Sequence, residues 1–321
     1  MRFGRCLKGA AVPEAETLGR LKESLVEICL TEGVRVDHRL AQLTTYRVGG
    51  PAALFVRPCD MTELLGIAEA LADTEVPSLI VGRGSNMLVA EAGFKGVVIQ
   101  LGPSFENSLV RGTRLTAGGA ASLPGVARFS VAEGLTGFEW AVGVPGSIGG
   151  AVRMNAGGHG SEMAEVLIEA TVLDLELATS STFSAAQLHL GYRCSSVSPR
   201  QVVTSATLAL KEGDRAQGSE LMAEIVRWRR ENQPGGQNSG SVFANPPGDS
   251  AGRLAELAGV KGLRIGTAVV SERHANFIQV DQGGSADDVF VLMFEVRRRV
   301  LEVHGVELHP ETVLVGFDGA P

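Results

Sequence analysis

The feature that most constrains this chain is a glycine-rich stretch over residues 137–160, which holds eight glycines and almost no hydrophobic periodicity. Long segments without a helix or strand pattern are uncommon inside compact domains, where they are usually functional. The centre of the stretch reads Gly143-Val144-Pro145-Gly146-Ser147-Ile148-Gly149-Gly150. Pro145 fixes a φ angle, and the glycines let backbone amides approach a ligand closely. The stretch therefore predicts a binding loop, with a purely structural role as the alternative.

A second glycine cluster reads Gly82-Arg83-Gly84-Ser85-Asn86. It follows a predicted strand over residues 78–81, and consecutive amides in such a turn can form an anion-binding nest. Ser85 and Asn86 add side-chain donors. No long helix follows, as a dinucleotide-binding fingerprint would require, so a plain tight turn is the alternative. Together, the two glycine loops suit a ligand with two phosphates, such as a dinucleotide.

Composition and charge exclude several classes of protein. The chain has 321 residues, 44% hydrophobic and 20% charged, which is typical of a globular protein of two or three domains. A net charge of −7 disfavours a dedicated nucleic-acid binder. No apolar run reaches the roughly 18 residues of a membrane helix, and four scattered cysteines are typical of reduced thiols. We therefore expect a cytoplasmic protein. We also expect no metal site, since His159, His274 and His309 do not have the spacing of metal ligands.

Hydrophobic periodicity predicts both helices and strands. Helices are expected over residues 14–31, 62–72, 122–133, 219–230 and 250–258, and from Ser285 to a stop at Gly305. Strands are expected over residues 53–57, 78–81, 87–90, 97–101, 165–177, 202–210 and 277–280. A polar run over residues 211–219 predicts a domain boundary. Three arginines at 297–299 predict a solvated helix face rather than a nucleic-acid site.

Three residues in the second half of the chain are candidates for chemistry. Arg193 could clamp a carboxylate, although a surface ion pair is the simpler interpretation. Ser241 lies at a glycine-flanked bend without the Gly-x-Ser-x-Gly pattern of a hydrolase, and its hydroxyl could donate a proton. Glu311 follows Pro310, and a carboxylate near an arginine could serve acid-base catalysis. Alone, each of these residues also fits an ordinary loop or turn.

In their order along the chain, these clusters resemble the UDP-N-acetylenolpyruvoylglucosamine reductase family of bacterial peptidoglycan synthesis. The motifs that carry the resemblance lie at residues 45–52, 82–89, 137–160, 192–193, 233–234, 240–247, 271–277 and 310–316. The resemblance covers about residues 37–317, and its specificity lies in the ordered set of motifs. It implies an α+β fold, with a two-part FAD-binding domain of the PCMH (vanillyl-alcohol-oxidase) type and a C-terminal α+β substrate-binding domain.

The resemblance also implies domain boundaries. Residues 1–34 would be a helical lead-in, and residues 35–101 the first FAD-binding part. A last strand over residues 307–321 would return to that part. Residues 102–210 would form the second FAD-binding part, and residues 211–306 the substrate-binding domain.

The implied reaction has two halves on non-covalent FAD. NADPH gives a hydride to the flavin, whose N5 then delivers it to the vinyl carbon of UDP-N-acetylglucosamine enolpyruvate, forming UDP-N-acetylmuramate. Arg193 and Glu311 would stabilise the enolate-like charge, and Ser241 would protonate the adjacent carbon. A glutamic acid beside an enolate must be protonated, so the pKa of Glu311 should be raised.

The matched motifs also imply binding residues. The expected cofactor-binding residues are Tyr46, Arg47, Gly82, Gly84, Ser85, Asn86, Gly143, Val144, Gly146, Ser147 and Gly149. The expected substrate-binding residues are Gln233, Asn245 and His274. We expect a monomer whose small-molecule partners are the enolpyruvyl sugar nucleotide and NADPH.

The chain departs from the family pattern in places. The usual Glu-Pro-Glu is His309-Pro310-Glu311, which keeps the catalytic candidate. The usual Gly-Ala-Tyr-Gly at the end of the long loop is Gly157-Gly158-His159-Gly160 here. A tyrosine-bearing insertion is absent, as in the shorter subclass. The alternatives are a flavin oxidase of the same fold with covalent FAD, a non-catalytic nucleotide-binding module and an NAD-type dehydrogenase.

Overall fold

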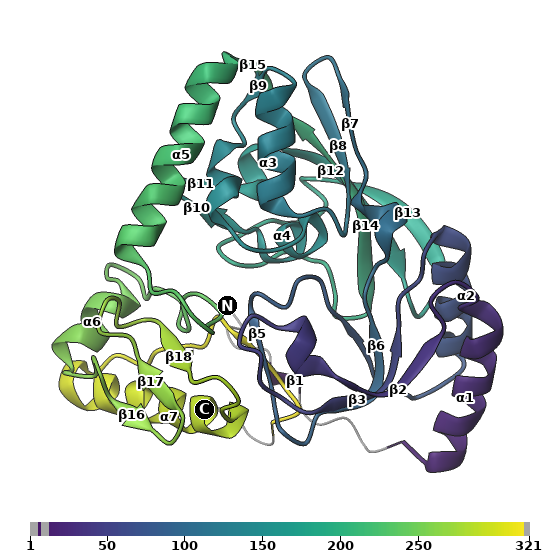
Figure 1. The fold of residues 1–321 in the computed structure, drawn as a ribbon. Helices are drawn as coiled ribbons and strands as arrows, with labels where there is room; N and C mark the ends of the chain where they lie inside the picture. The colour runs from purple at the N-terminus through teal and green to yellow at the C-terminus, as the bar shows by residue number, and fades with distance from the viewer. Residues whose placement is uncertain (1–5, 8–12, 318–321) are drawn as a thin grey trace.

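The N-terminal part of the chain is a four-stranded sheet with two helices packed on one face (Figure 1). The computed structural model describes residues 6–7 and 13–317. The elements are α1 (Ala15–Ile28), β2 (Val34–Arg39), η1 (Leu40–Leu43), β3 (Pro51–Val56), α2 (Met61–Ala72), β4 (Ser78–Ile80), β5 (Met87–Val89) and β6 (Phe94–Ile99). The sheet order is β2-β3-β6-β4, with β2 antiparallel to its neighbour. Leu25 of α1 and Leu64 of α2 are buried in one core with Leu54 of β3, as the predicted apolar spacing requires.

A five-stranded antiparallel sheet forms the second part. The elements are η2 (Pro103–Glu106), β7 (Ser108–Arg111), β8 (Arg114–Gly118), α3 (Leu123–Ala132), β9 (Leu135–Thr136), η3 (Glu139–Gly143), α4 (Ile148–Met154), β10 (Gly157–Gly158), β11 (Ser161–Glu162), η4 (Met163–Glu165), β12 (Leu167–Asp174), β13 (Thr179–Ser184) and β14 (Gln201–Ala209). The sheet order is β13-β12-β14-β8-β7. Helices α3 and α4 bury Val126 and Val152 in one core with Leu115 and Ala206 of the sheet.

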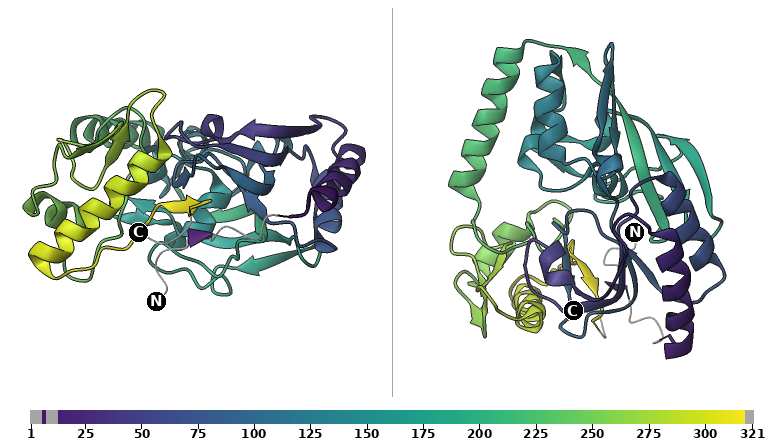
Figure 2. Two further views of the ribbon diagram at one scale, coloured as in Figure 1. Left: turned by 90° about the horizontal axis from the view of Figure 1, so that it is seen from below. Right: turned by 45° about the vertical axis from the view of Figure 1, so that its right-hand side comes forward.

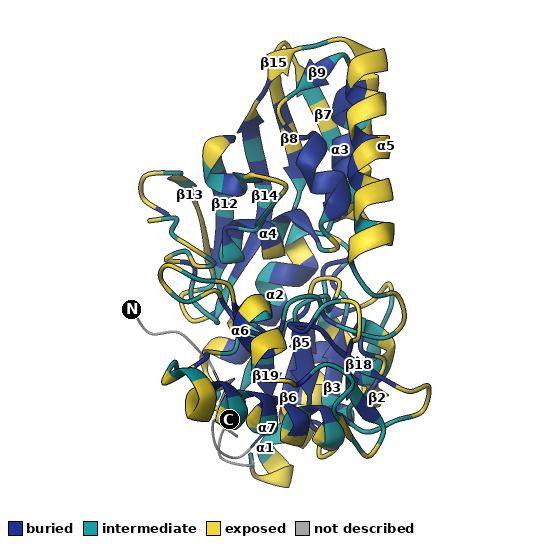
Figure 3. Cartoon of the chain, turned by 90° about the vertical axis from the view of Figure 1, so that its left-hand side faces the viewer, coloured by how far each residue is buried: buried dark blue, intermediate teal, exposed yellow. Residues whose placement is uncertain are grey.

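The third part combines a small sheet with helices. The elements are β15 (Lys211–Glu212), α5 (Arg215–Asn232), α6 (Ala251–Leu257), β16 (Arg264–Ile265), β17 (Ala268–Val270), β18 (Ile278–Val280) and α7 (Ala286–His304). Sheet β16-β17-β18 shares a core with α7. Helix α5 instead lies along the second part, with an exposed outer face (Figure 3), and places Met222 and Ile225 in that core. Packing therefore groups α5 with the second part, although the expected boundary at residue 211 assigns it to the substrate-binding domain.

The last strand of the described chain, β19 (Val313–Val315), leaves the third part. It pairs in parallel with β5 on one side and with β1 (Cys6–Leu7) on the other. Figure 2 shows this strand, in yellow, near the middle of the molecule. The rest of the expected lead-in before residue 13 lies outside the described residues. Because of this return, the residues just before β19 lie at the junction of all three parts.

The structure adds elements that the sequence patterns did not predict, among them β2, β7 and β8. Residues 137–160 are not uniformly irregular, because they contain η3 and α4, and Ser147 caps α4 by accepting a hydrogen bond from the Gly150 amide. Strand β13 was not predicted, because its residues are polar and mostly exposed, yet it pairs along β12. The arginines at 297–299 pair with glutamates of α7 and with Glu307, which fits the expected solvated face. The described helices fall short of what crossing a membrane requires.

Candidate active site

Two of the three catalytic candidates meet as an ion pair. Arg193 Nε lies 2.9 Å from Glu311 Oε1, within ion-pair range, although its N–H is not aimed for a hydrogen bond. Arg193 comes from the segment between β13 and β14, and Glu311 lies just before β19. The fold thus brings together two residues that are far apart in the sequence and come from different parts of the molecule.

Arg193 is held in a two-residue turn. The Gly191 amide donates to the Cys194 carbonyl at 2.9 Å, and the Cys194 amide donates back to the Gly191 carbonyl at 3.1 Å. Arg193 itself has a φ of 55°, a conformation that non-glycine residues rarely adopt. Such backbone strain concentrates at functional sites. The guanidinium also lies 5.4 Å from the centre of the Tyr192 ring, close enough for a cation–π contact.

Glu311 is largely shielded from water, with a side chain 17% exposed. Burial raises the pKa of this carboxyl above its ordinary value of 4.5, and the opposing effect comes from Arg193. The backbone of Glu311 is fixed at both ends. Its amide donates to the Val242 carbonyl at 2.8 Å, and its carbonyl accepts from Asn86 Nδ2 at 3.2 Å. The backbone at Glu311 is therefore held by segments from the first and third parts.

The segment that carries Ser241 is hydrogen-bonded to the segment that carries Glu311. The carbonyl of the next residue, Val242, accepts the amides of both Glu311 and Thr312. The Asn276 side chain binds the backbone of Phe243. Its Oδ1 accepts from the Phe243 amide at 2.9 Å, and its Nδ2 donates to the Phe243 carbonyl at 2.8 Å. Within the described residues, the half-buried Ser241 hydroxyl has no hydrogen-bond partner. The hydroxyl is therefore free to act on a ligand.

The two predicted glycine loops face each other. The Ser85 hydroxyl donates to the Pro145 carbonyl at 2.8 Å, and a Cβ added at Gly82 would lie 2.5 Å from Ser147 Oγ. Within the described part of the chain, the backbone amides of residues 82–86 and of Gly146 and Ser147 have no hydrogen-bond acceptor. Free amides on facing loops are suited to bind an anion such as a pyrophosphate.

Three of the polar side chains expected to help bind the cofactor already make hydrogen bonds within the protein. Ser85 donates to Pro145, Asn86 to the Glu311 carbonyl, and Ser147 caps α4. Tyr46 is completely buried in the core that it shares with Phe243, and burial raises the pKa of its hydroxyl to about 12. A contact between this ring and a cofactor would require the core to open. The Ser85 hydroxyl hydrogen is thus spent within the protein, whereas the loops still offer free backbone amides.

The other expected cofactor residues lie on or near these loops. Arg47 is exposed and has a φ of 56°. The Gly149 amide donates to the Gly119 carbonyl at 2.8 Å, which fixes the start of α4. Val144 is half-buried, and Gly143 packs against α5, where a Cβ would lie 2.9 Å from Ile225. These glycines therefore permit close packing within the protein as well as access for a ligand.

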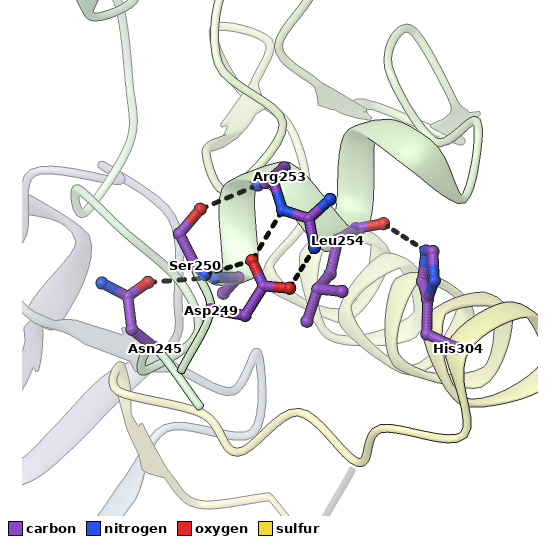
Figure 4. A network of polar contacts seen from close by, with 7 residues as sticks. Asn245, Asp249, Ser250, Arg253, Leu254 and His304 are labelled. Carbon is purple, nitrogen blue, oxygen red and sulfur yellow. Dashed lines mark hydrogen bonds and ion pairs between the residues drawn. The ribbon is translucent and has the colours of Figure 1, made fainter. Parts of the chain in front are cut away.

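The expected substrate-binding residues lie in the third part. Asn245 Oδ1 accepts from the Ala251 amide at 3.0 Å and so stabilises the start of α6 (Figure 4). His274 Nδ1 accepts from the Asn276 amide at 3.2 Å, and burial lowers the pKa of the ring. Gln233 Oε1 is buried and has no partner among the described residues. Of the three, Gln233 has the clearest unused hydrogen-bonding capacity.

Sequence reasoning missed the structural role of three asparagines. Asn86, Asn276 and Asn155 each bind the backbone of a segment that carries a catalytic candidate. All three belong to motifs that supported the family resemblance, but nothing in a single sequence shows which backbone group a side-chain amide will contact. Their positions within the motifs were the only sequence signal that pointed to these asparagines.

Substituting Gly84 tests how tightly the loops are packed. Gly84 has a φ of 57°, and a Cβ would lie 2.0 Å from the Leu43 carbonyl oxygen. We expect Gly84→Ala to lower the free energy of unfolding by more than about 1 kcal/mol and to reduce flavin content. Gly112 is the matched control, since its φ is 61° but no atom lies within 4 Å of an added Cβ. Equal urea midpoints for Gly84→Ala and Gly112→Ala would contradict the packing argument.

Comparison with known proteins shows which family this chain belongs to. Residues 52–181 match a family described as FAD binding domain, and residues 232–315 match the UDP-N-acetylenolpyruvoylglucosamine reductase C-terminal domain. The reductase of Heliobacterium modesticaldum is 44% identical over 87% of this chain and 90% of its own. The chain belongs to the UDP-N-acetylenolpyruvoylglucosamine reductase family. The Bacillus subtilis reductase is 37% identical over 88% of this chain and 94% of its own.

The fold agrees with this assignment to the reductase family. The crystal structure of the reductase from Thermus caldophilus matches with a TM-score of 0.76 and 36% identity, over 88% of this chain and 99% of that one. The expected fold class, a PCMH-type FAD-binding domain with a C-terminal α+β domain, is confirmed. The chain is therefore an FAD-dependent oxidoreductase of peptidoglycan precursor synthesis. The facing loops with free amides fit the pyrophosphate of FAD.

Proposed function

We propose that this chain reduces the enolpyruvyl group of UDP-N-acetylglucosamine enolpyruvate, giving UDP-N-acetylmuramate, with NADPH as the source of electrons. The observation that carries the proposal is the contact between Arg193 and the largely shielded Glu311, with the Ser241 segment bonded to the Glu311 backbone. Bound FAD supplies the hydride for the vinyl carbon. The chain's own residues bind the substrate, stabilise its negative charge and supply the proton.

Each of the three residues has a role that follows from its surroundings. The Arg193 guanidinium pairs with the substrate carboxylate, where negative charge grows during hydride transfer, and such preorganised charge is an effective form of catalysis. The protonated carboxyl of Glu311 donates a hydrogen bond to the same oxygen atoms. The Ser241 hydroxyl gives its proton to the carbon next to the carboxylate. The hydride and this proton together account for the two hydrogens added across the double bond.

The ion pair implies that substrate binding and protonation are coupled. In the free protein, Arg193 opposes the rise in the pKa of Glu311 that burial causes. A substrate carboxylate that pairs with Arg193 would remove this opposing effect and add a like charge. The pKa of Glu311 should then rise further, so that Glu311 gains a proton as the substrate binds.

The pH dependence of the second half-reaction tests this role of Glu311. The protonated fraction is present below the raised pKa and lost as the pH rises through it, so reoxidation of reduced flavin by the substrate should slow at high pH. In Glu311→Gln, the amide donates a hydrogen bond at every pH, and this pH limb should disappear. Stopped-flow reoxidation rates across pH, with and without the substitution, check it. An unchanged limb in Glu311→Gln would assign the titration to another group.

An anaerobic visible spectrum tests the proposed function as a whole. We expect NADPH to bleach the flavin bands of the purified protein, and the enolpyruvyl sugar nucleotide to restore them. Flavin bands that stay bleached would show that NADPH reduces the flavin but that the enolpyruvyl sugar nucleotide is not the substrate. Failure of NADPH to bleach the bands would reject NADPH as the electron source.

A further inference from the structure

Asn155 occupies an unusual position at the end of α4. It is completely buried, and its φ of 41° and ψ of 56° place it in the left-handed region. Its amide closes the helix by donating to the Val152 carbonyl at 3.3 Å. The same short helix begins at Ser147 in the second glycine loop. Asn155 is thus rigidly connected to the proposed pyrophosphate site.

Both ends of the Asn155 side chain are used, and one of them reaches the turn that carries Arg193. Nδ2 donates to the Gly191 carbonyl at 3.0 Å, and Oδ1 accepts from the Ala164 amide at 2.9 Å. Gly191 is one of the two residues that close the turn. A second contact runs from the Ser195 hydroxyl to the Arg153 carbonyl at 2.8 Å. The turn is therefore tied to the end of α4 on both sides of Arg193.

A turn tied in this way controls where the guanidinium lies. Arg193 has a strained φ of 55° inside a two-residue turn, so a displacement of Gly191 is transmitted directly to its side chain. A buried amide that loses its partner is costly, which makes the contact between Asn155 and Gly191 strongly preferred over alternatives. A shift of about 1 Å at a catalytic group can reduce a rate roughly 100-fold.

We propose that Asn155 is a positioning residue for the reaction, which holds the Arg193 turn in register with the flavin-binding loop through α4. The proposal rests on the proposed function of Arg193. A positioning role differs from a general structural role, because it requires Asn155 to influence the reaction through the position of the Arg193 guanidinium. It predicts that the loss of Asn155 affects substrate reduction selectively and does so only while Arg193 is present.

A double-mutant cycle between Asn155 and Arg193 tests the proposal. Asn155→Gly suits the left-handed position and removes only the side-chain bonds. In the otherwise unchanged protein, we expect it to slow flavin reoxidation by the substrate about 10- to 100-fold, and to change flavin reduction by NADPH less than about twofold. In the Arg193→Ala background, Asn155→Gly should change reoxidation less than about threefold. The same loss in both backgrounds would overturn the proposal.

Two further variants keep the test informative. Asn155→Asp retains the acceptor for Ala164 but places a carboxylate oxygen against the Gly191 carbonyl, and it should show the same selective loss. Asn107→Gly removes an exposed asparagine whose Nδ2 donates to the Ser104 carbonyl at 3.1 Å, and it should leave both half-reactions unchanged. Loss of flavin from both Asn155 variants would indicate a structural role and overturn the proposal. Normal reoxidation in Arg193→Ala alone would instead reject the proposed function of Arg193.

Discussion

Ser241→Ala is expected to leave flavin reduction by NADPH intact and to slow reoxidation by the enolpyruvyl substrate about 10²- to 10⁴-fold, the usual contribution of a positioned proton donor. The hydroxyl has no partner among the described residues, while the backbone around it is fixed by Glu311 and Asn276. Its removal should therefore take away a proton donor without moving the loop. Rapid-mixing measurements of the two half-reactions check the selectivity.

The control for Ser241→Ala is Ser219→Ala, which changes an exposed serine on α5 whose hydroxyl donates to the Arg215 carbonyl. We expect this variant to behave like the unchanged protein in both half-reactions. Equal losses of both half-reactions in Ser241→Ala would indicate a disturbed flavin site rather than a lost proton donor. Solvent deuterium should also slow reoxidation in the unchanged protein, because a proton moves in that step.

Arg193→Ala is expected to slow reoxidation roughly 10²- to 10³-fold, since it removes a preorganised charge from the position where the substrate develops its own. The substitution also frees Glu311 from its ion pair, so burial should raise the pKa of this carboxyl further. Flavin content should change little, because the facing glycine loops offer backbone amides and not this side chain. Flavin loss as the main effect would show that the assignment is wrong.

Arg200→Ala is the matched control for Arg193→Ala. Arg200 lies in the same segment before β14 and pairs with Glu176 at 3.1 Å, away from Glu311. Its removal should have little effect on reoxidation, because the Glu176 partner is 62% exposed and such solvated ion pairs contribute only about 0–1 kcal/mol to stability. A comparable loss of reoxidation in both variants would mean that any disturbance of this segment has the same effect.

Local sequence signals predicted much of the secondary structure. Ser285 and Gly305 mark the ends of α7, as expected, and the helix expected over residues 122–133 is α3, with Ser122 as its N-cap. Strand β13 was missed because an exposed polar strand is stabilised by its partner rather than by its own hydrophobic pattern. Helix α4 was missed because Gly149 and Gly150 lower its intrinsic helix propensity, whereas tertiary packing and the Ser147 cap favour it.

The active site was less accessible to sequence reasoning. Arg193, Ser241 and Glu311 were separate candidates, each of which also fitted an ordinary loop or turn. Only the family resemblance joined them into one site, because no local pattern shows that residues so far apart meet. The sequence also predicted Ser85 and Asn86 as phosphate donors, whereas their side chains bind Pro145 and Glu311. A polar residue in a glycine loop can serve a ligand or the protein itself. Only the folded arrangement of neighbouring segments distinguishes these two uses.

The return of β19 to β5 determines when this protein can become active during its synthesis. Residues 52–181, which match the FAD-binding family, leave the ribosome long before Glu311 does. Glu311 follows α7 in the chain and directly precedes the strand that pairs with β5, so its carboxyl group can reach Arg193 only after α7 has been made. A nascent chain that ends before Glu311 therefore lacks a group of the proposed substrate site, together with the contact between Glu311 and Asn86 of the first glycine loop. Catalytic competence is therefore one of the last properties that the growing chain acquires.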